Sequence, residues 1–214
     1  MATKVLLLAT IVLLLTILFL GAESQTFDHF FFVQQWPPTT CQQQQKPCFQ
    51  PPPATFKIHG LWPQKGPNSV VYCNKNFDRT QISSLENQLD VVWPDVVTGN
   101  NTGFWEHEWN KHGSCSESQF NQTLYFQTAI NMMNKVNLLK ALGKGGITSD
   151  ERTKSSQTMQ KVLLAQFGNQ PFLRCKKVGQ QFWLLEIVMC FKDDGVTMIN
   201  CQPSKVSCPP NFIF

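Results

Sequence analysis

Four side chains that transfer protons or carry charge cluster in one short segment of the chain. Within residues 104–113, Glu108, Lys111 and His112 lie close together in sequence, and His107 precedes them. Residues three and four positions apart share a face of a helix, so this spacing places Glu108 beside His112 and Lys111 beside His107. A carboxylate favours the imidazolium form of a neighbouring histidine, and a lysine opposes it. The segment therefore predicts acid–base chemistry next to a fixed positive charge.

A second histidine suited to such chemistry lies in a strand-like segment. Residues 55–61 alternate between apolar and polar side chains, which predicts a half-buried strand that presents His59 away from the core. We expect Gly60 and Pro63 to end this strand. Two imidazoles, His59 and His112, facing each other across a cleft would supply a base for the 2′-hydroxyl proton of RNA and an acid for the departing 5′ oxygen.

The charge that develops during such a reaction needs further groups around the two histidines. A phosphorane-like transition state needs positive donors, which is the role expected of Lys111 and His107. Trp62 is expected to pack beside a base or a ribose. Gly113 is expected to end the helix that carries His112.

The elements that must position these residues follow from periodicity and turn residues. Helices are predicted over residues 82–92, about 124–139 and about 148–167, and strands over 27–33, 182–191 and 196–199. Gln64 to Asn76 has the composition of a variable surface loop. Because strands and helices coexist without a regular βαβ alternation, the predicted fold class is α+β, an antiparallel sheet with packed helices.

The start of the chain has the pattern of a cleaved secretory signal. Lys4 precedes an apolar run, and small or polar residues follow it. We expect residues 1–24 to be a signal peptide and residues 25–214 to form one secreted, extracellular domain. In that setting the sequons at Asn100 and Asn121 predict glycosylation.

All eight cysteines lie after the predicted signal, which indicates disulfides rather than metal ligands. Eight cysteines allow about a hundred pairings, so the residues alone leave the connectivity open. Antiparallel strands on either side of a turn at residues 193–195 would bring Cys190 and Cys201 together. Cys175 and Cys208 would then form an outer, nested bridge.

The charge of the chain is a weak guide to its partners. Its formal net charge is +4 and its pI is about 8.6, and the basic residues are dispersed. This balance indicates a mild preference for polyanions and not a nucleic-acid-binding arm.

Three segments resemble the ribonuclease T2 family. IHGLWP at residues 58–63 and FWEHEWNKHGSC at residues 104–115 are similar to its two active-site signatures, and FVQQWP at residues 32–37 extends the resemblance. The resemblance covers essentially the whole mature chain. It implies an α+β fold and endonucleolytic transesterification of single-stranded RNA, without a metal or cofactor, that leaves a 2′,3′-cyclic phosphate and a free 5′-hydroxyl.

The resemblance also implies roles for individual residues. By motif position, His112 is the expected base and His59 the expected acid, while Glu108 and Lys111 stabilise the transition state. The residues expected to bind substrate are Trp62, His107 and Gln35. The implied bridges are Cys41–Cys48, Cys73–Cys115, Cys175–Cys208 and Cys190–Cys201.

Within that family, the signal, the basic pI and QQWPP at residues 34–38 look most like the style S-RNases of the rose family, which reject self pollen by degrading RNA in pollen tubes. The loop from Gln64 to Asn76 is hypervariable in that group, so the resemblance implies that pollen F-box proteins bind there. The protein is expected to be a monomer. Lys57 departs from the usual threonine and adds a charge beside His59. Because His107 is not general in that group either, a defence or phosphate-scavenging ribonuclease stays an alternative.

Two further classes of function compete with this interpretation. A metal-dependent nuclease using His107, His112 and Cys115 is disfavoured, because an oxidising compartment would take Cys115 into a disulfide. A catalytically inactive storage or binding protein on the same fold is disfavoured because both His59 and His112 are present.

Overall fold

The structure, a computed structural model, describes residues 27–42, 47–202 and 208–214. The predicted signal peptide, residues 1–24, lies outside the described residues. Among the residues that are described, no helix is long and apolar enough to cross a membrane.

Three long strands form the centre of the sheet and position everything else. β1 (His29–Gln35) pairs antiparallel with β2 (Lys57–Lys65) on one side and with β6 (Gln181–Lys192) on the other. The other strands are β3 (Asn68–Ser69), β4 (Thr153–Ser155), β5 (Phe172–Val178), β7 (Met198–Ile199) and β8 (Asn211–Ile213). β3 extends β2, while β5 and β7 pair antiparallel with β6. β8 pairs parallel with β6 and antiparallel with β4, so the sheet is mixed only at this end.

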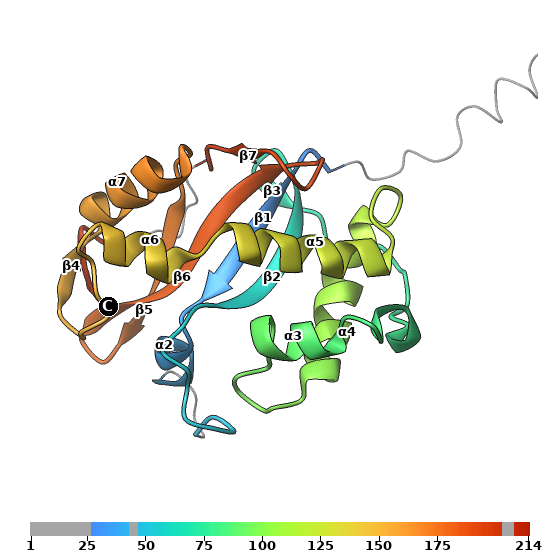
Figure 1. The fold of residues 1–214 in the computed structure, drawn as a ribbon, viewed down its shortest axis with the longest axis horizontal. Helices are drawn as coiled ribbons and strands as arrows, with labels where there is room; N and C mark the ends of the chain where they lie inside the picture. Colours follow the sequence, from blue (N-terminus) through green and yellow to red (C-terminus); the bar gives the residue numbers. More distant parts are fainter. Residues whose placement is uncertain (1–26, 43–46, 203–207) are drawn as a thin grey trace, which may run out of the picture.

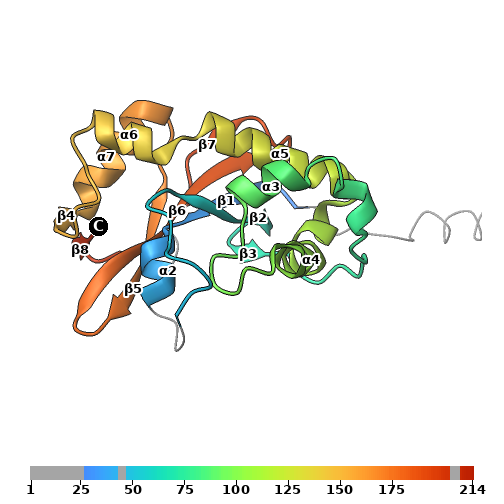
Figure 2. The ribbon, with the colours of Figure 1, turned by 60° about the horizontal axis from the view of Figure 1, so that its bottom comes forward.

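Helices cover one face of this sheet and both of its ends. α5 (Gln122–Lys135) and α6 (Leu138–Lys144) run one after the other across the face (Figure 1). At one end, α3 (Glu86–Val92) and α4 (Asn101–Lys111) lie beside β2 and β3, whereas α6 and α7 lie at the other (Figure 2). The remaining helical elements are α2 (Pro37–Gln42), α7 (Ser156–Phe167) and two 3₁₀ helices, Arg79–Ile82 and Gly113–Ser116. The predicted α+β class is confirmed.

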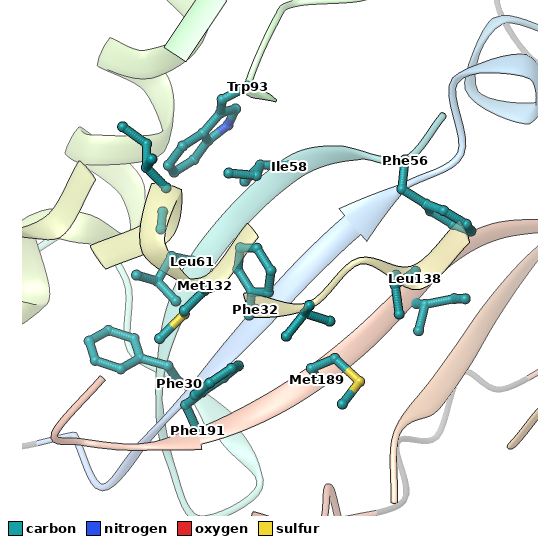
Figure 3. Packing of buried hydrophobic residues seen from close by; sticks show 14 of the residues in the cluster. Phe30, Phe32, Phe56, Ile58, Leu61, Trp93, Met132, Leu138, Met189 and Phe191 are labelled. Atoms are coloured by element: carbon teal, nitrogen blue, oxygen red, sulfur yellow. The ribbon is translucent and has the colours of Figure 1, made fainter. Parts of the chain in front are cut away.

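The two faces of the sheet have different tasks because side chains alternate along each strand. Phe32 of β1 is fully buried in the main core under α5 and α6, where Figure 3 shows it between Leu61 and Met189. Val33, its neighbour in sequence, belongs to a smaller cluster that also contains Val188. One face therefore carries most of the apolar packing, and the other is available for the polar residues of a site.

All four disulfides implied by the sequence form in the structure. The nested pair inferred from the hairpin is present as Cys190–Cys201 and Cys175–Cys208. The bridges Cys41–Cys48 and Cys73–Cys115 complete the set. The predicted connectivity is confirmed.

The predicted end of β2 is wrong, and the strand continues through Gly60 and Pro63 to Lys65. Proline lacks only the N–H donor, and the Pro63 carbonyl accepts a hydrogen bond from the Val70 N–H at 3.0 Å. Gln64, expected as the first residue of a surface loop, is therefore part of a strand and almost fully buried.

The helices predicted over 82–92, 124–139 and 148–167 have different bounds from those expected. The first begins at Glu86, and Ile82 belongs to the 3₁₀ helix before it. The helix over 124–139 is divided at Val136, whose backbone is not helical, and Asn137 caps α6 by accepting from the Lys140 N–H at 3.0 Å. The last helix begins at Ser156 and not near residue 148, because residues 153–155 pair with β8 and Ser155 is the N-cap. Strands β3, β4, β5 and β8 were not predicted.

We predict that the Cys73–Cys115 bridge stabilises the fold more than the Cys41–Cys48 bridge does. Their sequence separations are 42 and 7 residues. Because longer closed loops restrict the unfolded chain more, replacing both cysteines by serine should lower the free energy of unfolding by about 4 kcal/mol for the first pair and about 2.5 kcal/mol for the second. Equilibrium urea denaturation of the two double variants measures the difference, and equal losses would contradict this order.

Candidate active site

His59 lies on β2 and faces away from the main core, as predicted. Ile58 before it is fully buried, while the His59 side chain is partly exposed. The Trp93 indole N–H donates to the His59 carbonyl at 3.0 Å and holds the backbone in place. The Nδ1 atom of His59 is hydrogen-bonded to a carboxylate oxygen of Glu186.

α4 carries the other predicted residues and is anchored by two tryptophans. Trp105 and Trp109 are buried, and the Trp105 indole N–H donates to the Trp93 carbonyl at 2.7 Å. This places Glu108 and His112 on the side of α4 that faces β2. The helix ends at Lys111 and not at Gly113, since His112 is the C-cap and its N–H still donates to the Glu108 carbonyl.

A pocket of about 380 Å³ lies between β2, β3 and α4. It brings together six of the seven residues predicted to act on or bind a substrate. Those six are His59, Trp62, His107, Glu108, Lys111 and His112, and the remaining lining residues are Ser69, Val71 and Phe104.

Gln35, the seventh, does not line this pocket. Its side chain is almost fully buried, donates to the Ile58 carbonyl at 3.3 Å and accepts from the Thr40 hydroxyl at 3.1 Å. In this structure Gln35 braces β2 beside His59, and its predicted contact with substrate stays a prediction.

Trp62 connects the strand to the helix. Its indole N–H donates to Glu108 Oε2 at 2.8 Å, and its ring stacks on His112 with centroids 5.0 Å apart. A Cβ atom at Gly60 would overlap both the Trp62 indole nitrogen and the Glu108 carboxylate. Glycine at position 60 therefore makes room for this contact.

The surroundings of His59 favour its charged form. Burial alone disfavours the imidazolium, but the hydrogen bond and negative charge of Glu186, together with the charge of Glu108, outweigh it and raise the pKa of His59. Arg174 acts in the opposite direction and reduces this effect. His59 is therefore suited to give up a proton as an acid at a pH where an ordinary histidine has already lost it.

The surroundings of His112 favour its neutral form. Burial, followed by the positive charges of Lys111, His59 and His107, lowers the pKa of His112 to about 3. Its Nδ1 atom is buried and has no hydrogen-bond partner among the described residues. Nε2 is thus the nitrogen that can accept a proton from the pocket, as a base must.

Burial also shifts the pKa of Glu108 and of His107, which line the pocket beside these histidines. Burial raises the pKa of Glu108, against the lowering effects of His59, the Trp62 hydrogen bond and Lys111. Burial and Lys111 lower the pKa of His107. Glu108 and His112 are almost fully buried, whereas His107 is exposed, so charge interactions are strengthened most around the first two.

Two residues that contact the site were missed in the sequence. Arg174 Nη1 donates to Glu186 Oε2 at 3.2 Å, and its guanidinium lies 5.1 Å from the Trp62 ring centroid. One signal pointed to Glu186, because it is the only charged residue in the apolar run 182–191 and a buried charge needs a partner. Nothing in the sequence pointed to Arg174, because β5 itself was not predicted.

The metal-dependent alternative does not fit these residues. Cys115, one of its three expected ligands, is bonded to Cys73 and has no thiolate to offer. Within residues 27–42, 47–202 and 208–214, no three His, Cys, Asp or Glu side chains are grouped to hold a metal ion.

Comparison with known proteins identifies the class of protein that this fold and pocket define. The model of the "Ribonuclease T2 family" matches residues 27–201. Ribonuclease MC from Momordica charantia is 45% identical over 164 residues, which cover 75% of this chain and 85% of that protein. Ribonuclease S-2 from Pyrus pyrifolia is 33% identical, over 94% of this chain and 95% of that protein.

Solved structures agree with this result. Ribonuclease MC1 from the seeds of bitter gourd superposes with a TM-score of 0.84 at 45% identity, over 88% of this chain and 100% of that chain. A single-residue mutant of RNase MC1, also with a TM-score of 0.84, was solved in complex with 5′-UMP, at 45% identity over 88% of this chain and 98% of that one. The chain therefore belongs to the ribonuclease T2 family, and it is an enzyme of the ribonuclease T2 type.

We predict an asymmetric pH profile for RNA cleavage. With neutral His112 as the expected base and protonated His59 as the expected acid, activity should rise through the pKa of His112 and fall through the pKa of His59. Because burial and nearby cations hold the first at about 3 and Glu186 raises the second, the acidic limb should lie well below the ordinary histidine value and the basic limb above it. kcat/KM measured across pH at constant ionic strength tests this, and two limbs near the ordinary value would contradict it.

Proposed function

We propose that this enzyme cleaves single-stranded RNA internally, without a metal, by transesterification that leaves a 2′,3′-cyclic phosphate. In this reaction Nε2 of neutral His112 removes the proton of the 2′-hydroxyl, whose oxygen attacks the adjacent phosphorus. Protonated His59 donates a proton to the 5′ oxygen as its bond to phosphorus breaks. The observation that carries the proposal is that one pocket holds two histidines whose surroundings shift their pKa values in opposite directions.

The other lining residues act on charge and on position in this proposal. Lys111 supplies positive charge to the transition state, and Glu108, held by the Trp62 indole, stabilises it from the same helix. His107 and Trp62 bind the substrate from the pocket wall, as the motifs lead us to expect. Gln35 does not line the pocket and instead supports β2 through its hydrogen bond to the Ile58 carbonyl.

The mechanism is tested by replacing each histidine with asparagine. H59N and H112N should each lower the cleavage rate by about 10²- to 10⁴-fold, because each removes an acid or base. H29N is the matched control, since His29 is paired with Asp28 at the start of β1 and does not line the pocket. Digestion of single-stranded RNA in EDTA, with mass spectrometry of the product ends, should give cyclic phosphates for the wild type and H29N.

Three results would contradict the mechanism. Wild-type rates in H59N or in H112N would remove that residue from its role. Loss of activity in EDTA would restore the metal-dependent alternative. Intact RNA with the wild-type protein would favour the inactive binding relative.

We also propose that the chain is secreted and glycosylated. Residues 1–24 would be removed as a signal, and residues 25–214 would form one monomeric domain. Asn100 and Asn121 are exposed N-caps of α4 and α5, and each cap uses the side-chain oxygen and not the nitrogen that would carry a glycan. The capping geometry is thus compatible with modification at both sites.

For the biological role we propose general RNA degradation, as in defence or phosphate scavenging, ahead of pollen rejection. The specific support is the higher identity to ribonuclease MC, at 45%, than to the pear ribonuclease S-2, at 33%. Self-incompatibility, with F-box partners at residues 64–76, is the second candidate, supported by the S-RNase resemblance.

We expect transcripts of a general ribonuclease in vegetative tissues and seeds as well as in styles. Quantitative transcript measurement across these tissues checks this, with a housekeeping gene as the reference. Expression confined to styles, together with high allelic variation at residues 64–76, would overturn the general role in favour of self-incompatibility.

A further inference from the structure

We propose that Glu186 and Arg174 form a positioning pair that fixes the orientation of His59 and keeps it ready to donate its proton. This inference rests on the proposed function, because it assigns a purpose to two residues around the proposed acid. Neither residue lies in the two active-site signature segments, 58–63 and 104–115. The pair is built by two adjacent strands, β5 and β6, and it contacts His59 on β2.

The geometry of Glu186 is that of a shared carboxylate. The residue lies in the centre of β6, its side chain is 6% exposed, and its two oxygens have different partners. Oε1 is hydrogen-bonded to His59 Nδ1, and Oε2 accepts from Arg174 at 3.2 Å. With Nδ1 engaged on the side of the sheet, Nε2 is the His59 nitrogen that is directed to a substrate.

Arg174 is held where it can restrain the carboxylate. It lies directly opposite Glu186 in the pairing of β5 with β6, and the register shifts immediately after it. Its guanidinium also packs near two aromatic rings, 5.1 Å from the Trp62 centroid and 5.2 Å from the Phe172 centroid. The same side chain therefore contacts the partner of His59 and the tryptophan that stacks on His112.

The charges around His59 come from every element packed against it. Glu186 faces it from β6 and Arg174 from β5, while Glu108, His107 and Lys111 of α4 and the cap residue His112 lie across the pocket. Burial disfavours the imidazolium of His59, Glu186 stabilises it by hydrogen bond and charge, Glu108 stabilises it by charge, and Arg174 opposes it by charge. The two members of the pair therefore act on the proton affinity of His59 in opposite directions.

The proton balance of the step keeps Glu186 ionised throughout. His59 loses the Nε2 proton to the 5′ oxygen of the leaving nucleoside, and the Nδ1 proton stays between His59 and Glu186. The carboxylate thus gains no proton. When Nε2 takes up a proton from water, the negative charge of Glu186 stabilises the charged form of His59 again. Arg174 keeps the second oxygen of the carboxylate occupied, so Glu186 has one orientation toward His59.

The test compares E186Q, which keeps the size of the natural side chain, with R174Q, which shortens it; each variant removes one charge. E186Q should lower kcat/KM by roughly 10- to 100-fold, as expected when a catalytic group loses its alignment, and should move the basic limb of the pH profile to lower pH. R174Q should move that limb to higher pH, because it removes the opposing positive charge. E86Q is the matched control, since Glu86 at the start of α3 pairs with Arg79 of the preceding 3₁₀ helix and does not line the pocket.

A second readout does not depend on catalysis. NMR titration of the His59 ring proton, assigned by its absence in H59N, should give a lower pKa in E186Q and a higher pKa in R174Q than in the wild type. Near-ultraviolet circular dichroism checks that each variant keeps its tertiary structure. A purely structural ion pair would change the thermal midpoint of both variants without moving their basic limbs in opposite directions. The titrations therefore separate a positioning role from a structural one.

The outcomes distinguish this inference from the proposed function. His59 titration and basic limbs that stay at their wild-type positions in both variants would overturn the positioning pair. Full activity in H59N would instead overturn the acid role of His59, whatever the titrations show. Opposite shifts in E186Q and R174Q, with E86Q unchanged, support the pair.

Discussion

Strand β2 must serve two surfaces at once, and the site depends on an irregularity in its pairing with β1. Ile58 and Leu61 are fully buried in the main core, while His59 and Trp62 face the pocket. The members of each pair are three residues apart, so strict alternation would place them on opposite faces. The register with β1 shifts where Val33 pairs with Gly60 and Gln34 with Ile58, which leaves His59 as an extra residue and keeps both pairs together. Gly60 also allows the Trp62 indole to reach Glu108.

Contact with a carboxylate gives the two histidines their different properties. His59 and His112 line the same pocket and burial acts to lower the pKa of both, but only His59 is hydrogen-bonded to a carboxylate that is itself held by an arginine. His112 is buried beside Lys111, and no described residue is hydrogen-bonded to its Nδ1 atom. The same side chain is thus favoured in its charged form at position 59 and in its neutral form at position 112, as the proposed acid and base require.

The parts that the sequence predicted are those encoded in short stretches. The helix that carries Glu108 and His112 follows from local spacing, and the bridge Cys190–Cys201 follows from one hairpin. The contact between His59 and Glu186 spans 127 residues, and no local pattern determines which strands pair. Two-residue and three-residue strands such as β3 and β8 have too few positions to show a period. The break at Val136 was missed for a related reason, since that apolar residue is fully buried and continues the helical pattern of its neighbours.

The loop after β2 is linked to the catalytic helix more closely than its composition suggested. Ser69 and Val71 line the pocket, the Tyr72 N–H donates to the Lys111 carbonyl at 2.8 Å, and Cys73 is bonded to Cys115 just after His112. A change in this loop that moves its backbone therefore acts on the end of α4 directly. The Tyr72 side chain is exposed, and its contact with the helix is made by the backbone. The fold thereby permits variation on the outer surface of the loop while its backbone and its disulfide keep His112 in position.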